Sequence, residues 1–300
     1  MRLSLGPLQY FWPRRQVLDF YAESLGWPLD VVYLGETVCS KRRELRQRDW
    51  IALAQQQAQA GREVLLSSLA LIEAESELGA LQQLAAQGQF RIEANDISAV
   101  QVCRRRGLPF VGGPGLNVYN LDTLRLLQDD GLYRLVLNVE MSGELVAELR
   151  AAAAAANQAL PELELIAWGR LPLAYSARCF TARALDLAKD QCGFRCIDHP
   201  DGLPLQTRDG REFLTLNGIQ VQSAERCDLL PEWPQLAAAG INLLRLYPQR
   251  DGTAEALQRF RAVRDGAPPP ARETGSTPGY WNGQPAALHR TETAITGAPP

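Results

Sequence analysis

Short apolar segments alternate with longer amphipathic segments along most of the chain. Eight of the apolar segments have the length and composition of buried strands: Leu3–Leu8, Asp30–Leu34, Glu63–Ser67, Phe90–Glu93, Pro109–Gly112, Tyr133–Asn138, Glu162–Ala167 and Asn242–Leu246. The segments between them have the period of amphipathic helices. Eight alternations of strand and helix predict a parallel sheet, and eight parallel strands can close into a (β/α)8 barrel. The pattern therefore predicts the α/β class and a single TIM-barrel-like domain.

The helical period is clearest in three segments, Pro13–Leu25, Ile97–Arg106 and Gly143–Asn157. One side of each is apolar and is predicted to be buried: Val17, Leu18, Tyr21 and Leu25 in the first, Ile97, Val100 and Cys103 in the second, and Leu145, Val146 and Leu149 in the third. On this assignment Cys103 is a core residue, and we interpret Cys227 in the same way.

The spacing of the predicted strands is regular except before the last one. Nearly eighty residues separate the start of the seventh strand from the start of the eighth. We assign residues 1–265 to the barrel and residues 168–230 to an insertion between strands 7 and 8. Residues 266–300 are rich in Pro and Gly and have no periodicity, so we expect them to be largely irregular.

The charge balance excludes some classes of function. The 300-residue chain has 31 Lys and Arg against 34 Asp and Glu, a formal net charge of −3. Such a chain has no overall positive field, which makes nucleic-acid binding an unfavoured interpretation. Its apolar segments are broken by Arg, Glu or Gln and are too short to span a membrane. The N-terminus also lacks the apolar core of a signal peptide, so we expect a cytoplasmic protein.

The scarcity of histidine limits the chemistry that the chain can perform. The sequence has two histidines, His199 and His289, which leaves little for His-based catalysis or a multi-His metal site. It also lacks the Gly-x-Ser-x-Gly and His-Glu-x-x-His motifs of common hydrolases. Four carboxylates follow predicted strands and are candidate general acids or bases, unless they cap helices or pair with arginines: Glu36, Glu93, Asp96 and Glu140.

Cysteine is the residue type that most clearly indicates a site. Cys179, Cys192 and Cys196 all lie in the insertion, and Cys39 follows the second predicted strand on the side where barrel active sites form. Four thiolates suit a structural zinc ion or an iron–sulfur cluster, and the spacing does not decide between them. Free buried cysteines are the alternative. His199 is a further candidate ligand, or else a residue of a surface turn.

A basic run follows Cys39 directly and comprises Lys41, Arg42, Arg43, Arg46 and Arg48. It is either the solvated start of a helix or an anion-binding lip at the barrel mouth. Arg178 and Arg183 of the insertion could complete such a lip. We single out Arg42, Arg43 and Arg178 as candidate substrate-binding residues for a carboxylate or phosphate.

Several sequence blocks together resemble the collagenase-like peptidase superfamily. They are Tyr33–Arg43, Leu108–Gly112 with Leu116–Asn120, Leu171–Arg183, Leu216–Gln220 and Leu244–Gln249. The resemblance extends from about Met1 to Trp281. It implies that Cys39, Cys179, Cys192 and Cys196 ligate a [4Fe-4S] cluster, and thus favours iron over zinc.

The resemblance also implies an activity and partners. Members of this kind are expected to hydroxylate the aromatic ring of ubiquinone precursors without molecular oxygen, with prephenate as the oxygen donor. The expected partners are a UbiU-like sister subunit in a heterodimer, and a sterol-carrier-like protein that presents the lipophilic quinone precursor. Prephenate is a dicarboxylate, which would give Arg42, Arg43 and Arg178 a purpose. Peptidase activity is doubtful because no nucleophile–base pair is evident.

Two alternatives of other classes remain open at the level of sequence. The chain could hydroxylate an RNA base, as relatives in the superfamily do. It could also be a non-catalytic partner subunit whose metal site only stabilises the insertion.

Overall fold

Eight parallel strands form a closed ring. The computed structural model describes residues 1–284. Around the ring the strands follow one another in chain order, and the first and seventh both pair with the last, which closes the barrel. They are β1 (Arg2–Leu5), β2 (Val31–Leu34), β3 (Glu63–Ser67), β4 (Arg91–Ala94), β5 (Phe110–Gly112), β6 (Leu132–Val136), β7 (Glu162–Tyr175) and β11 (Leu243–Leu246). Each overlaps one predicted strand, and the (β/α)8 prediction is confirmed.

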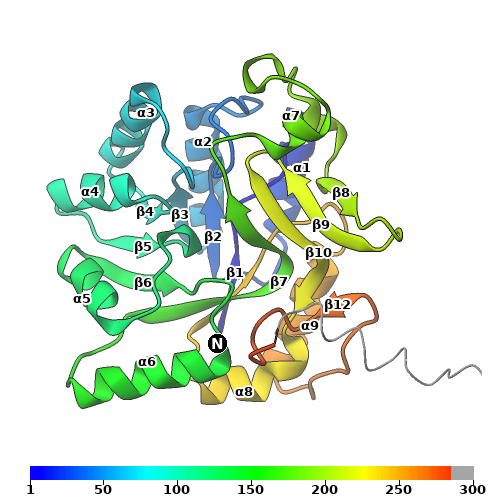
Figure 1. The fold of residues 1–300 in the computed structure, drawn as a ribbon. Helices are drawn as coiled ribbons and strands as arrows, with labels where there is room; N and C mark the ends of the chain where they lie inside the picture. The colour runs from blue at the N-terminus through cyan, green and yellow to red at the C-terminus, as the bar shows by residue number, and fades with distance from the viewer. Residues whose placement is uncertain (285–300) are drawn as a thin grey trace, which may run out of the picture.

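Helices connect these strands and cover the outside of the ring (Figure 1). The seven that do so are α1 (Arg14–Ser24), α2 (Gln47–Gln59), α3 (Glu75–Ala86), α4 (Ile97–Arg105), α5 (Leu121–Asp129), α6 (Gly143–Ala155) and, after β11, α9 (Thr253–Arg264). Within the described residues, no helix is long and apolar enough to cross a membrane.

Three residues assigned to buried helical faces are in fact exposed. Leu25, Ile97 and Leu145 are 40%, 67% and 41% exposed, respectively. All three lie at helix ends: Leu25 is the C-terminal cap of α1, Ile97 is the first residue of α4, and Leu145 lies in the first turn of α6. Burial in a terminal turn depends on what packs against that turn: Val146 is fully buried beside the exposed Leu145, so helical phase alone does not decide it. Cys103 and Cys227 are buried, as predicted.

The insertion begins inside a strand. Strand β7 continues past the predicted end at Ala167 to Tyr175, and residue 168 therefore lies within it. Gly169 has a φ of 108°, and beyond this point β7 leaves the ring and pairs antiparallel with β10. The added elements are α7 (Phe180–Ala184), β8 (Leu203–Gln206), β9 (Glu212–Asn217) and β10 (Gln220–Asp228), and α8 (Trp233–Ala238) leads back to β11. Figure 1 shows β8–β10 as an arm beside the barrel.

The segment after α9 returns to the barrel. Residues 266–275 contain no helix or strand, and Ser276–Thr277 form β12, which pairs with β10. Trp281 is buried, and its carbonyl oxygen accepts a hydrogen bond of 2.9 Å from the backbone N–H of Gly143. The rest of the predicted irregular tail, residues 285–300 with His289, lies outside the described residues.

The barrel interior contains a buried ion-pair network centred on Arg245. Its Nη1 lies 2.6 Å from a carboxylate oxygen of Glu93, and its Nε lies 2.8 Å from Glu164. All three side chains are fully inaccessible to solvent. Burial alone would raise the pKa of Glu164, but the guanidinium groups of Arg245 and Arg134 hold it below its ordinary value. The network links β11, β4 and β7 across the ring.

A second buried cation lies nearer the other end of the barrel. Arg134 on β6 is 2.8 Å from Glu63 and 2.8 Å from Glu162, and it donates to the hydroxyl of Tyr33. The Tyr33 hydroxyl donates in turn to Glu164 at 2.5 Å. This contact joins the two groups of ion pairs into one network. The strands that surround this network have only short runs of apolar residues. Ion pairs as well as apolar packing therefore hold the strands in place.

We expect Arg245→Met to lower the free energy of unfolding by about 3–5 kcal/mol, because it leaves two buried carboxylates without their cation. Urea unfolding measures the change. Arg15→Met is the control, since the Arg15 side chain is 94% exposed and, within residues 1–284, its ion pair is with Asp19 on the same helix. Equal losses for the two variants would show that the buried ion pairs do not hold the barrel together.

Candidate functional site

The loop after β2 carries the first cysteine of the site. It starts at Gly35, whose φ is 137° and whose Cβ, if it had one, would lie 2.7 Å from the carbonyl oxygen of Ser67. Only glycine allows the ends of β2 and β3 to approach this closely. The carboxylate of Glu36 then accepts hydrogen bonds from the backbone N–H groups of Val38 and Cys39, at 2.8 and 3.0 Å. The loop therefore holds Cys39 at the C-terminal end of the barrel.

The other three cysteines lie on consecutive short elements of the insertion. Cys179 caps α7, and its Sγ accepts from the backbone N–H of Ala182 at 3.4 Å. Cys192 ends a short helical turn, η2 (Lys189–Gln191), and Cys196 lies in the next one, η3 (Arg195–Asp198). Cys39, Cys179, Cys192 and Cys196 are all free and partly accessible.

Ion pairs attach the insertion to the barrel loops next to these cysteines. Lys41, two residues after Cys39, lies 2.6 Å from Asp190 of η2. Lys189 lies 2.7 Å from Glu73, which precedes α3. These exposed contacts are individually weak. Their effect here is geometric, because they bring the segment with Cys192 against the loop with Cys39.

The thiols interact electrostatically with one another. Burial raises the pKa of the Cys39 thiol, and the neighbouring Cys179 raises it further. Burial also raises the pKa of Cys196, where Arg42 acts in the opposite direction and Cys179 adds to the increase. Asp190 raises the pKa of Lys41, and the nearby Cys192 and Cys39 raise it further. These interactions place Cys39 and Cys196 near Cys179, whereas Cys192 is linked to Cys39 only through Lys41 between them.

The cysteines do not form a preorganised site for a single metal ion. Zinc draws its sulfur ligands to about 2.3 Å from the ion, and within residues 1–284 no group of three or more His, Cys, Asp and Glu side chains is arranged to hold an ion. In a four-iron cluster each thiolate binds a different iron atom, so its sulfur ligands lie further apart than those of a single zinc ion. The absence of a site for one ion therefore does not argue against a cluster.

Arg42 has a structural role: its side chain is buried and hydrogen-bonded, and it is not part of an open, solvent-exposed lip. It is 4% exposed, and its guanidinium donates to the carbonyl oxygen of Gln9 and to Asn217, both at 2.7 Å. A Cβ on Gly218, where φ is 62°, would lie 2.9 Å from the Arg42 Nη2. Burial alone would lower the pKa of Arg42, but the charges of Glu36 and the cysteines around it keep that pKa above its ordinary value.

The remaining predicted cations lie in two separate cavities. Arg43 borders a cavity between α2 and α3. Arg178 and Arg183 border a second cavity of about 370 Å³ that also includes Cys179. Arg42 also borders the first cavity, but its guanidinium bonds Gln9 and Asn217. The lip predicted from Arg42, Arg43 and Arg178 is therefore divided between two cavities, and Arg43, unlike Arg42, is exposed.

The family model for peptidase family U32 matches residues 23–265, well over half of the chain. The chain belongs to this family. The resemblance described from the sequence is thereby confirmed at the level of the family.

The solved structures that are similar to this chain are distant. Dihydropteroate synthase from Thermus thermophilus has a TM-score of 0.44 at 13% identity, over 89% of this chain and 94% of that chain. A putative dihydrodipicolinate synthetase from Pseudomonas aeruginosa has a TM-score of 0.45 at 10% identity, over 89% and 77%. Yersinia pestis dihydropteroate synthase has a TM-score of 0.43 at 14% identity, over 89% and 94%.

The residues described in this family member include no hydrogen-bonded pair of a histidine with a serine or cysteine nucleophile. His199 follows η3, and its backbone N–H donates to the carbonyl oxygen of Cys196 at 3.2 Å. That contact orders the turn after Cys196 and leaves the imidazole available. Peptidase chemistry therefore has no evident nucleophile and base in this part of the chain.

The four candidate carboxylates all have structural partners. Glu36 orders the Cys39 loop, and Glu93 pairs with Arg245. Asp96 caps α4 by accepting from the backbone N–H of Ser98 at 2.8 Å, and Glu140 accepts from the Tyr119 hydroxyl at 3.0 Å. Capping a helix or pairing with an arginine, the alternative that the sequence left open, therefore describes Glu36, Glu93 and Asp96, whereas Glu140 bonds a tyrosine instead.

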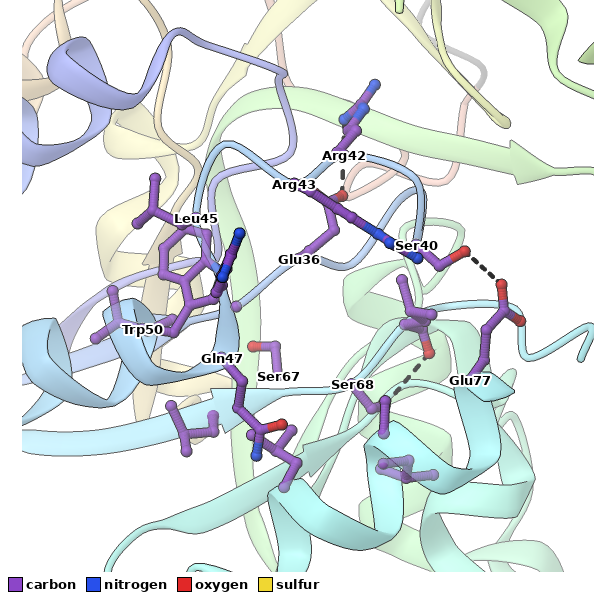
Figure 2. Close-up of a pocket in the computed structure, with 18 of the residues that line it drawn as sticks. Glu36, Ser40, Arg42, Arg43, Leu45, Gln47, Trp50, Ser67, Ser68 and Glu77 are labelled. Atoms are coloured by element: carbon purple, nitrogen blue, oxygen red, sulfur yellow. Dashed lines mark hydrogen bonds and ion pairs between the residues drawn. The ribbon is translucent and has the colours of Figure 1, made fainter. Parts of the chain in front are cut away.

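Sequence reasoning missed a cavity beside Cys39. It measures about 380 Å³ and lies between α2, α3 and the ends of β2 and β3. Figure 2 shows Leu45 and Trp50 on one side and Ser40 and Glu77 on the other. Its walls come from four separate segments of the chain, and the sequence pattern of each is that of an ordinary barrel strand, loop or helix. A cavity formed in this way has no local sequence signal.

We expect Arg42→Gln to lower the free energy of unfolding by about 3 kcal/mol. The substitution removes the cation next to the Glu36 carboxylate and the hydrogen bonds to Gln9 and Asn217. Arg43→Gln is the matched control and should change it little, since Arg43 is exposed and has no hydrogen bond or ion pair within the described residues. Urea unfolding of the cluster-free protein measures both. Similar effects for the two variants would contradict the structural role of Arg42.

Proposed function

We propose that this chain is a UbiV-type member of its family, the iron–sulfur subunit of an oxygen-independent system that hydroxylates the ring of ubiquinone precursors. The observation that supports this is that the insertion with the free thiols of Cys179, Cys192 and Cys196 is held by ion pairs against the loop that carries the free thiol of Cys39. In a family member with no evident nucleophile–base pair, four free and partly accessible thiols on adjoining loops favour redox or structural metal chemistry over hydrolysis.

The donor set fits a [4Fe-4S] cluster. Each of the four cysteines would supply one thiolate, and the bound cluster would supply one-electron transfer. Arg42 interacts with Cys196, and Lys41 lies where the charges of Cys39 and Cys192 reach it. These positive groups oppose the effect of burial and would offset the negative charge of thiolates bound to a cluster. The chain's own part is to hold the four sulfurs together and to offset their charge.

The cavity at Cys179 suits a carboxylate co-substrate. Arg178 and Arg183 are exposed and have no ion-pair partner among the described side chains, and both line this cavity of about 370 Å³. Guanidinium groups bind carboxylates in a bidentate geometry. A dicarboxylate such as prephenate, as oxygen donor, would meet both arginines beside a cluster ligand. We therefore propose Arg178 and Arg183 as the carboxylate-binding pair, in place of Arg42, Arg43 and Arg178 together.

Exposed apolar side chains on the insertion support a protein partner. Leu187, Phe194, Leu205 and Phe213 are large and apolar, are exposed by 36% to 56%, and all belong to the insertion. Exposed large apolar side chains are typical of interaction surfaces. We propose that the insertion, which carries these four on separate elements, binds the UbiU-like sister subunit. The sterol-carrier-like protein would deliver the lipophilic substrate to the assembled pair.

A second function, a non-catalytic subunit with a structural zinc, would use the same four cysteines. It is favoured by the absence of an evident acid–base pair among the candidates, because Glu36, Glu93, Asp96 and Glu140 are all occupied by structural contacts. The metal content of the purified protein separates the two functions.

We expect anaerobically purified protein to contain about four iron and four sulfide per chain, and Cys179→Ala to lose most of both. Cys103→Ala is the matched control, because Cys103 is buried on α4 away from the mouth. Iron and acid-labile sulfide assays and the visible spectrum measure the effect. Zinc in place of iron would support the structural alternative.

The hydroxylation itself is tested with the sister subunit present. We expect prephenate-dependent hydroxylation of a ubiquinone precursor that disappears in Cys179→Ala and weakens in an Arg178→Gln, Arg183→Gln double variant. Full activity of a cluster-free protein would overturn the catalytic proposal. Salt-dependent RNA binding without ring hydroxylation would instead support RNA-base modification.

A further inference from the structure

The barrel mouth, where active sites of this fold usually form, is filled in this protein. A layer of buried amide side chains closes it, and its members bond to one another and to the barrel: Gln9, Asn217, Gln220 and Gln222. Gln220 continues the layer by donating to the Tyr175 hydroxyl at 3.1 Å. A substrate of any size therefore needs space at the side of this roof.

The cavity between α2 and α3 supplies such a space next to the cysteine site. Ser40, which follows Cys39 directly, lines it and donates to Glu77 of α3 at 2.5 Å. Its deep wall is apolar and buried, with Leu34 and Leu66 at the strand ends and Leu81 on α3. Trp50 closes one side (Figure 2). At about 380 Å³ it falls within the usual range for small-molecule sites.

The acidic groups that border the cavity already have partners. Glu36 accepts from two backbone N–H groups and lies 3.8 Å from Arg42. Glu77 accepts from Ser40 and from the backbone N–H groups of Glu73 and Ala74. The charge of Glu36 is offset by Arg42. Glu77 keeps its charge, but its oxygens are already occupied by three hydrogen bonds.

Two cations at the rim have no such partner. The guanidinium groups of Arg43 and Arg46 are exposed, line the cavity, and make no hydrogen bond or ion pair with other described side chains. The wall is thus apolar inside and cationic at the opening. This distribution complements a molecule with an apolar body and a negatively charged or acidic head.

We propose that the cavity between α2 and α3 binds an elongated apolar molecule through its tail, with an anionic or acidic head group held by Arg43 and Arg46 at the rim. The tail lies against Leu66, Leu81 and Trp50. The head lies next to the loop that carries Cys39. The assignment concerns a binding site distinct from the cavity of Arg178 and Arg183.

The binding itself does not depend on the proposed function, but its use in catalysis does. If the protein acts on a lipophilic aromatic substrate, this cavity is where the substrate would meet the cysteine site, and the carboxylate donor would approach from the side of Cys179. Loss of binding and loss of the cluster can be told apart, because the substitution that fills the cavity, Ala80→Trp, changes none of the four cysteines.

The test measures binding of dansyl-undecanoic acid, a fluorescent long-chain carboxylate, to the purified full-length protein below the concentration at which the probe aggregates. Ala80→Trp fills the cavity from an exposed position on α3 and should weaken binding by about tenfold or more. Ala86→Trp is the matched control, an exposed alanine on the same helix outside the cavity, and should bind like the wild type.

The head group is tested by charge. Arg43→Gln should weaken binding of the probe by about threefold or more, whereas Arg48→Gln, an exposed arginine outside the cavity, should not. Unlabelled decanoate should displace the probe, and decyltrimethylammonium should not. Equal binding by the Ala80→Trp and Ala86→Trp proteins would overturn the site, and displacement by the cationic amphiphile would overturn the assigned head group.

Iron content, measured on the same preparations, keeps the two proposals apart. A wild-type protein that binds the probe but contains no iron would leave this site in place and reject the cluster. Normal iron in Ala80→Trp together with lost binding would show that the cavity, and not the cysteine site, holds the probe.

Discussion

The ion pairs of Arg245 are the interaction on which the rest of the structure depends. A ring of eight short strands encloses limited apolar volume, and here a guanidinium group with two carboxylates occupies part of it. Buried ions of this kind are stable only when they are fully paired, so the three strands that carry them must keep their relative register. That register positions the strand ends, and the strand ends position every loop of the candidate site.

The closed roof moves the chemistry from the barrel axis to its edge. In most (β/α)8 proteins the loops after the strands surround an open mouth. In this chain β7 continues beyond the ring, and β10 returns along it with a row of buried amides. One cavity lies on the α2–α3 side, next to Cys39, and another lies against α7 and includes Cys179. Our proposals assign a different ligand to each of these cavities.

Charged residues divide into those that build the structure and those that remain available. Arg42 and Arg43 are adjacent in sequence, yet Arg42 is bonded beneath the roof and Arg43 is open to the α2–α3 cavity. All four candidate carboxylates were recognisable as residues at strand ends. Their hydrogen bonds show that they order loops, cap a helix or neutralise arginines, an outcome that local sequence allowed but could not select.

Local pattern determined the barrel strands and the presence of helices between them, and it singled out the cysteines as candidates, because strand and helix periods and residue chemistry are readable over a few positions. It misjudged Leu25, Ile97 and Leu145, because burial at a helix end depends on what packs against that end. The separation of Arg42 from Arg43, the closure of the mouth and the α2–α3 cavity were decided only by tertiary structure. Each of these depends on side chains that lie far apart in sequence, such as Gln9 with Asn217, or Ser40 with Glu77, and no single segment carries the information for such a contact.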